Sequence, residues 1–180
     1  MEGSLQIYIP ALMLVAMLIL LFWKYVRQAI PIRVPHPNIE KITNYNRLKR
    51  LGGYYWLLFI AFLLITIIYT LAPELYSYLL PIERLNHPFI NEIGLIVMKL
   101  SLVWILIAQI QLDRELYKYS RNIDNLEAME LIHFSEKTLL SGILLLFLGF
   151  LITITSITGI FLVLISFVLY FKNFRFGHSN

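Results

Sequence analysis

Residues 139–171 form an apolar run of 33 residues that contains no Asp, Glu, Lys or Arg. As one helix this run would be about 50 Å long, whereas the hydrocarbon core of a bilayer is about 30 Å thick. A cluster of Thr and Ser between Thr153 and Gly159 interrupts the run. We therefore predict two membrane-spanning helices, at 139–154 and 157–171, joined by a tight turn as a helical hairpin.

Three earlier apolar runs, at 7–23, 54–71 and 93–112, approach or reach the length that a helix needs to cross a bilayer. Charged residues make up only 14% of the chain, whereas a soluble domain carries about 25%. The pattern predicts a single domain, residues 1–180, that lies in a lipid bilayer. The expected fold class is all-α, a polytopic membrane helix bundle of about five transmembrane helices.

The distribution of Lys and Arg orients these predicted spans. The polar segments 24–53 and 113–138, together with the residues after 171, hold 13 of the 15 basic residues. Because cytoplasmic loops are enriched in Lys and Arg, we predict that both segments are cytoplasmic loops. The N-terminus is then outside and the C-terminus is cytoplasmic. Glu2, with no basic segment before the first apolar run, predicts a retained anchor rather than a cleaved signal peptide.

Three polar residues interrupt the predicted span 93–112: Lys99, Gln109 and Gln111. A charged side chain inside a membrane is costly and often functional. The long stem of Lys99 also allows its ammonium group to reach the interface, near Glu92 or a lipid phosphate. The two Gln residues can form hydrogen bonds between helices, which stabilise membrane proteins modestly.

Gly142, Gly149 and Ser156 are spaced seven residues apart, which places them on one face of a helix. Small residues allow a neighbouring helix to approach closely in a membrane. We predict that this stripe packs within the hairpin or against the span 93–112. A contact with a partner subunit is the alternative.

The acidic residues and His of the segment 113–138 are candidate metal ligands. Glu130 and His133 have the Glu-x-x-His spacing of a di-iron ligand pair, but such sites use two copies of the motif, and the sequence has one. The chain also has no Cys. We predict no metal site, and an amphipathic interfacial helix with solvated charges. Topology accounts for the basic residues, so nucleic-acid binding is not predicted.

Several pieces of the chain fit one known family. They include Ala-Pro-Glu-Leu-Tyr at 72–76, Ala-Gln-Ile-Gln at 108–111 and the paired apolar helices at the end. The chain from Tyr54 to Arg175 resembles bacterial isoprenylcysteine carboxyl methyltransferase-like proteins. The resemblance implies about five spans around a pocket that faces the cytoplasm, in the bacterial inner membrane. That pocket would take S-adenosylmethionine from the water side and a lipophilic substrate from the bilayer.

The family's donor-binding motif corresponds to residues 134–143, at the start of the predicted span 139–154. The resemblance assigns donor binding to four residues: Ser135, Lys137, Gly142 and Arg175. Glu136 stands where the family has a basic residue and Thr138 where it has Pro. A carboxylate at Glu136 opposes the carboxylate of the donor, which needs positive or hydrogen-bond-donating groups.

Two functions follow from this mixture of retained and altered residues. The first is a non-catalytic subunit or accessory of a membrane complex, which keeps the helical scaffold, has lost the donor contacts and binds partner subunits. The alternative is an active S-adenosylmethionine-dependent methyltransferase acting on a lipophilic membrane substrate. A third possibility is a small-molecule or lipid carrier that uses the crevice between the span 93–112 and the hairpin. No catalytic residue is assigned, and the first hypothesis predicts no cofactor.

Overall fold

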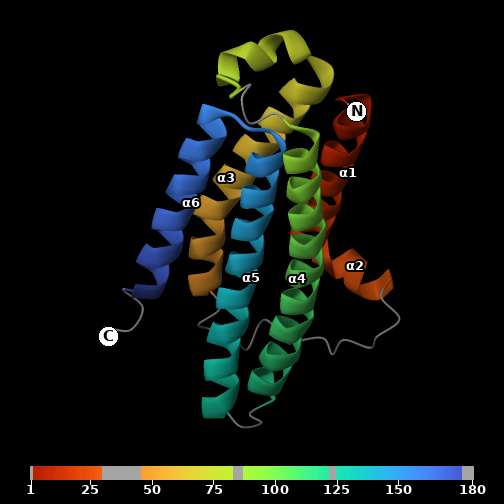
Figure 1. Ribbon diagram of the computed structural model, residues 1–180. Helices are drawn as coiled ribbons and strands as arrows, with labels where there is room; N and C mark the ends of the chain where they lie inside the picture. The colour runs from red at the N-terminus through yellow and green to blue at the C-terminus, as the bar shows by residue number, and fades with distance from the viewer. Residues whose placement is uncertain (1, 30–45, 83–86, 122–124, 176–180) are drawn as a thin grey trace.

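A computed structural model describes residues 2–29, 46–82, 87–121 and 125–175. Within these ranges the chain is all-helical, and the only β-type pairing is an isolated bridge between Pro81 and Ser156. The helices run roughly parallel to one long axis, with one short segment across the upper end and another bent out at the side (Figure 1). The helices are α1 (Glu2–Leu21), α2 (Trp23–Ala29), α3 (Asn46–Leu71), the 3-10 helix η3 (Pro73–Leu79), α4 (Pro88–Ser120), α5 (Asn125–Thr153) and α6 (Ile157–Arg175).

Two described helices, α4 and the part of α5 from Glu130 to Thr153, are long and apolar enough to cross a membrane. A third span results if α1 and α2 count as one, although their axes differ by 97°. The apolar parts of α3 and α6, Leu57–Leu71 and Ile157–Lys172, are shorter. The structure therefore supports a helical membrane protein with two or three long apolar helices.

The break predicted inside the run 139–171 is present, because α5 ends at Thr153 and α6 begins at Ile157. The closest partner of α5 is nevertheless α4, along most of its length. The bundle core lies where α1, α3, α4 and α5 meet. There Phe62 stacks on Phe147 with ring centroids 4.3 Å apart, and Phe150 meets Phe62 edge-on at 5.2 Å.

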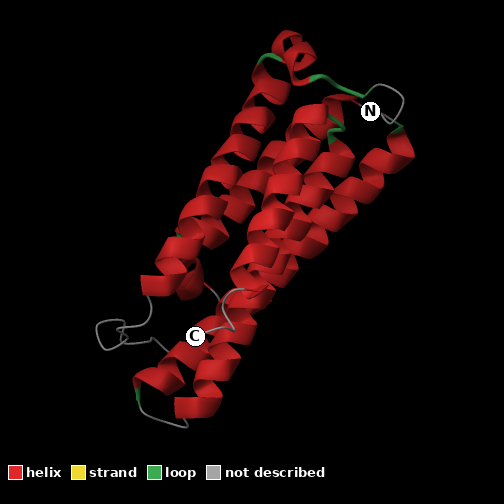
Figure 2. Cartoon of the chain, turned by 90° about the vertical axis from the view of Figure 1, so that its left-hand side faces the viewer, coloured by secondary structure: helices red, strands yellow, loops and turns green. Residues whose placement is uncertain are grey.

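The segment 113–138, predicted as a cytoplasmic loop with an amphipathic helix, consists mainly of helix in its described residues. Helix α4 continues to Ser120 and α5 already begins at Asn125, so the described residues of this segment other than Arg121 are helical. At 33 and 29 residues, the two helices are about 50 and 44 Å long. Both views show the α4–α5 pair extending past the ends of α3 and α6 (Figures 1 and 2). We call this extension, residues 114–121 and 125–133, the α4–α5 extension.

The other predicted loop, 24–53, also contains helix. Residues 24–29 belong to α2, and α3 begins at Asn46, eight residues before the predicted span 54–71. Residues 30–45 of this loop lie outside the described residues. The predicted span 7–23 ends early, because the chain bends sharply after Leu21 and α2 turns away from the bundle (Figure 1).

Candidate functional site

The stretch proposed to bind a methyl donor, residues 134–143, lies in the middle of α5 rather than at a helix start. Helix α5 begins nine residues earlier, at Asn125. Backbone N–H groups in the middle of a helix donate to carbonyls one turn earlier, so those of 134–143 are occupied. The Thr138 hydroxyl also donates within the helix, to the Phe134 carbonyl at 2.8 Å. This stretch therefore lacks the free N–H groups of a helix N-terminus, which could hold a carboxylate.

The four residues assigned to donor binding are placed differently from one another. Ser135 is fully buried, and its hydroxyl donates to the Leu131 carbonyl at 2.8 Å. Gly142 packs on α4, where a Cβ atom would lie 2.9 Å from Ile105 Cγ1 and 3.0 Å from Trp104 Cδ1. Lys137 is exposed. Arg175 is the last residue of α6, and its side chain lies outside the described residues.

Two members of the small-residue stripe, Gly142 and Gly149, lie against α4. A Cβ atom on Gly149 would be 2.8 Å from the Met98 backbone nitrogen and 3.0 Å from the Gly94 carbonyl oxygen. Ser156 does not continue this helix face, because it lies in the turn between α5 and α6. There it is fully buried, and its hydroxyl accepts a hydrogen bond from the Gly159 N–H at 3.1 Å.

Sequence reasoning assigned no packing role to Gly94, which forms the α4 side of this contact. A Cβ atom there would lie 2.6 Å from the Thr153 backbone nitrogen and 2.8 Å from the Gly149 carbonyl oxygen. Contacts below 3.0 Å with backbone atoms leave no room for a side chain. The two helices therefore cross with their backbones in direct contact at Gly94 and Gly149.

The polar residues of α4 face in different directions. Lys99 is exposed on the outer surface of the bundle, Gln109 is buried and Gln111 is partly buried.

His133 and Glu136 on α5 pair at 3.5 Å. Among the described residues, no three His, Asp or Glu side chains come close enough together to hold a metal ion.

Sequence reasoning also did not identify a cluster of hydrogen bonds around Asp113. This carboxylate is buried on α4 and accepts hydrogen bonds from the Trp23 indole N–H and the Arg27 guanidinium, each at 2.8 Å. Trp23 and Arg27 are four residues apart and lie on one face of α2. These two hydrogen bonds join α2 to α4, and the axis of α2 lies at 97° to that of α1. The spacing of Trp23 and Arg27 could have indicated a shared partner, but not which one.

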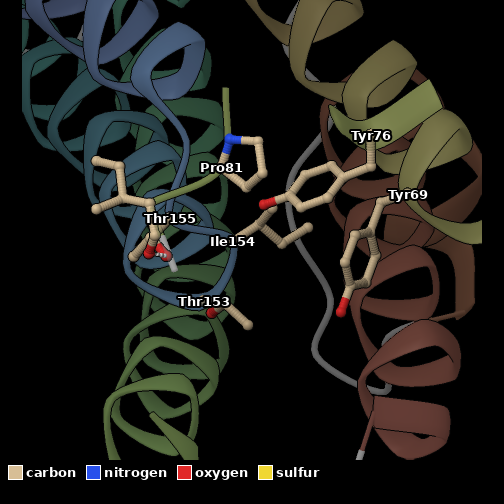
Figure 3. A pocket seen from close by; sticks show the side chains of 7 residues that line it. Tyr69, Tyr76, Pro81, Thr153, Ile154 and Thr155 are labelled. Atoms are coloured by element: carbon tan, nitrogen blue, oxygen red, sulfur yellow. Dashed lines mark hydrogen bonds between the residues drawn. The ribbon is translucent and has the colours of Figure 1, made fainter. Parts of the chain in front are cut away.

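A small cavity lies at the opposite end of the bundle, beneath η3 (Figure 3). Its volume is about 50 Å³, and the lining residues are Tyr69, Tyr76, Pro81, Ile82, Thr153, Ile154 and Thr155. The segment after η3 is tied to the α5–α6 turn by two backbone hydrogen bonds. The Ile82 N–H donates to the Thr155 carbonyl at 3.0 Å, and the Ile157 N–H donates to the Leu80 carbonyl at 3.1 Å.

Two tyrosines form one wall of this cavity. The rings of Tyr69 and Tyr76 meet edge-to-face with centroids 5.2 Å apart. The Tyr76 hydroxyl is directed toward Ile154 and Pro81 (Figure 3). Burial, with a smaller contribution from Tyr69, raises the pKa of Tyr76 from 10.0 to about 12. Tyr76 therefore stays a neutral phenol that can both donate and accept a hydrogen bond.

The comparisons with known proteins identify no relative from which a function could be transferred. No protein-family model, no curated protein and no solved structure matches this chain.

Proposed function

We propose that this protein is a non-catalytic subunit or accessory of a membrane protein complex, with the α4–α5 extension as its contact for a partner subunit. The proposal includes five membrane spans, with the N-terminus outside and the α4–α5 extension in the cytoplasm. The distribution of basic residues supports this orientation, because the positive-inside rule applies to the segments that follow α1, α4 and α6.

The observation that carries the proposal is the length of the α4–α5 pair. Helices of about 50 and 44 Å exceed the hydrocarbon thickness of about 30 Å, and their excess lies together at one end of the bundle (Figure 2). Arg114 and Arg121 are exposed on this extension, and Lys118 is 40% exposed. A paired helical extension with charged side chains offers a pre-formed surface to a soluble domain or a second membrane protein.

The geometry of residues 134–143 supports the non-catalytic part of the proposal. Methyl transfer requires that donor and acceptor be held in line. Here Ser135 donates within its own helix, and the space beside Gly142 is filled by Ile105 and Trp104. The exposed face of the same stretch carries Phe134 and Lys137.

The orientation is tested by single-cysteine labelling, because the chain has no Cys of its own. Ser77→Cys lies on η3 and Ser120→Cys at the end of α4. We expect a membrane-impermeant maleimide added to intact cells to label Ser77→Cys only. Labelling of Ser120→Cys before lysis would overturn the orientation.

The partner contact is tested by affinity purification from native membranes in a mild detergent. We expect a stoichiometric partner with the wild-type chain and its loss when Arg114 and Lys118 are both replaced by Glu. Glu74→Lys, an exposed charge reversal on η3 at the other end of the bundle, is the matched control and should retain the partner. A wild-type chain that purifies as a monomer would contradict the proposal.

The methyltransferase alternative is tested by calorimetry with S-adenosylmethionine. The proposal expects no heat of binding at millimolar donor. Binding that is lost in a Lys137→Ala variant would instead establish the alternative.

A further inference from the structure

The cavity beneath η3 is too small for a nucleotide and too large for a single water molecule. One water needs about 10–15 Å³ of such volume, so about 50 Å³ accommodates a group of roughly four non-hydrogen atoms. Typical pockets for drug-sized ligands measure about 300–1,000 Å³. The cavity therefore fits the end of a molecule or a very small one.

The walls of the cavity favour positive charge. The faces of Tyr rings attract cations, and Tyr69 and Tyr76 form one wall. The opposite wall is the C-terminal end of α5, with Thr153 and Ile154. The C-terminal end of a helix is the negative end of its dipole. None of the seven lining residues is Asp, Glu, Lys or Arg, so no charged side chain of the lining competes for the space.

The first turn of α6 is also near the cavity, but the N–H groups of Ile157 and Gly159 in it are occupied. The Ile157 N–H donates to the Leu80 carbonyl, and the Gly159 N–H donates to the Ser156 hydroxyl at 3.1 Å. An anion would need such donors to be free. By contrast, the Tyr76 hydroxyl has no hydrogen-bond partner among the described residues, so it is available to accept a bond from an N–H group.

We propose that this cavity binds a small alkylammonium group, which Tyr69 and Tyr76 hold by cation–π contact while the Tyr76 hydroxyl accepts an N–H hydrogen bond. Tyr78, 81% exposed on the same 3-10 helix, is typical of an aromatic residue at the membrane–water interface. The group can therefore come from the headgroup of phosphatidylethanolamine or from a free amine. This inference rests on different residues from the proposed partner contact.

The lipid source is tested by native mass spectrometry of the full chain with an equimolar mixture of phosphatidylethanolamine and phosphatidylglycerol. We expect preferential retention of phosphatidylethanolamine. Tyr76→Leu should reduce this preference by between roughly twofold and thirtyfold, the range of a cation–π contact. Tyr78→Leu removes an exposed Tyr of η3 that does not line the cavity, and should leave the preference unchanged.

The free-amine source is tested by calorimetry with ethanolamine at millimolar concentration. Binding that Tyr76→Leu weakens, without a lipid preference, would assign the cavity to a soluble amine. Equal retention of both lipids together with no ethanolamine binding would overturn the proposal.

If Tyr76→Leu does not fold, Tyr76→Phe replaces it as the test of ammonium binding in the cavity. It keeps the ring and removes only the hydroxyl, so we expect a partial loss of ammonium binding. Unchanged binding in Tyr76→Phe would exclude the hydroxyl as an acceptor. An experimental structure in phosphatidylethanolamine that shows only ordered waters in the cavity would also overturn the proposal.

Discussion

The two ends of α4 are joined to neighbouring helices by different kinds of interaction. At the end near η3, Gly94 and Gly149 bring the backbones of α4 and α5 into direct contact. At the other end, the buried carboxylate of Asp113 binds Trp23 and Arg27 of α2. Close packing therefore joins α4 to α5 near η3, whereas a charged cluster joins α4 to α2 toward the C-terminal end of α4, which we call the charged end.

The largest effect is expected at the charged end. Replacing Asp113 by Ala removes the carboxylate that lies 2.8 Å from the guanidinium of Arg27, on a side chain only 10% exposed. Breaking a buried ion pair from one side costs about 3–5 kcal/mol. We expect a marked fall in the melting temperature of the protein in detergent, together with release of α2. The release should appear as faster maleimide labelling of a Gln28→Cys reporter on α2.

Asp113→Asn is the control for this prediction. The amide oxygen still accepts a hydrogen bond from the Trp23 indole, so the loss of stability should be smaller than with Ala. An Asp113→Ala protein that melts at the wild-type temperature would show that the cluster does not hold α2.

The next largest effect is expected at the glycine contact. A Cβ atom at Gly94 would lie 2.6 Å from the Thr153 backbone nitrogen, and backbone cannot move aside as a flexible side chain can. Over-packing costs about 1–3 kcal/mol, so Gly94→Ala should lower the melting temperature. Gly142→Ala is the matched comparison. A Cβ atom at Gly142 meets the side chains of Ile105 and Trp104, so Gly142→Ala should lower the melting temperature less than Gly94→Ala. Equal decreases in melting temperature would contradict this distinction between backbone and side-chain contacts.

Part of this contrast can be predicted from the sequence. The seven-residue spacing of Gly142 and Gly149 indicates a close-packing face, although it does not identify the partner helix. Gly94 is a single glycine, so nothing in its own neighbourhood reveals the contact before the register of α4 and α5 is known. Ser156 breaks the pattern because the helix ends at Thr153.

The charged end is harder to predict from sequence. Asp113 and the charged residues after it indicate a solvated loop when only hydropathy is considered. Their spacing also suits a helix, because Glu115 and Lys118 pair at i and i+3 with a distance of 3.1 Å. The contact of Asp113 with Trp23 and Arg27 spans up to 90 residues of sequence, and it depends on the bend after Leu21.

A smaller effect is expected at the second ion pair of the charged end, between Glu115 and Lys118. Comparing it with the Asp113–Arg27 pair separates the effect of a buried ion pair from that of a more exposed one. The Lys118 side chain is 40% exposed, and such pairs contribute about 0.2–1 kcal/mol. Lys118→Ala should therefore lower the melting temperature only slightly, and less as salt concentration rises. A loss as large as that of Asp113→Ala would mean that the Glu115 carboxylate, whose side chain is 6% exposed, depends on Lys118.

The smallest effect at neutral pH is expected for Tyr76→Phe, at the end near η3. The pKa of Tyr76 is raised in the folded protein from 10.0 to about 12, so the folded state retains a proton that the unfolded state loses. Its contribution to stability is complete below pH 10 and is lost as pH rises from 10 to about 12. We expect wild type and Tyr76→Phe to melt alike at pH 8. Above pH 10 the wild type should lose stability more steeply. Tyr78→Phe, an exposed control, should follow the wild type throughout, and parallel curves for all three proteins would show that Tyr76 is not held away from water.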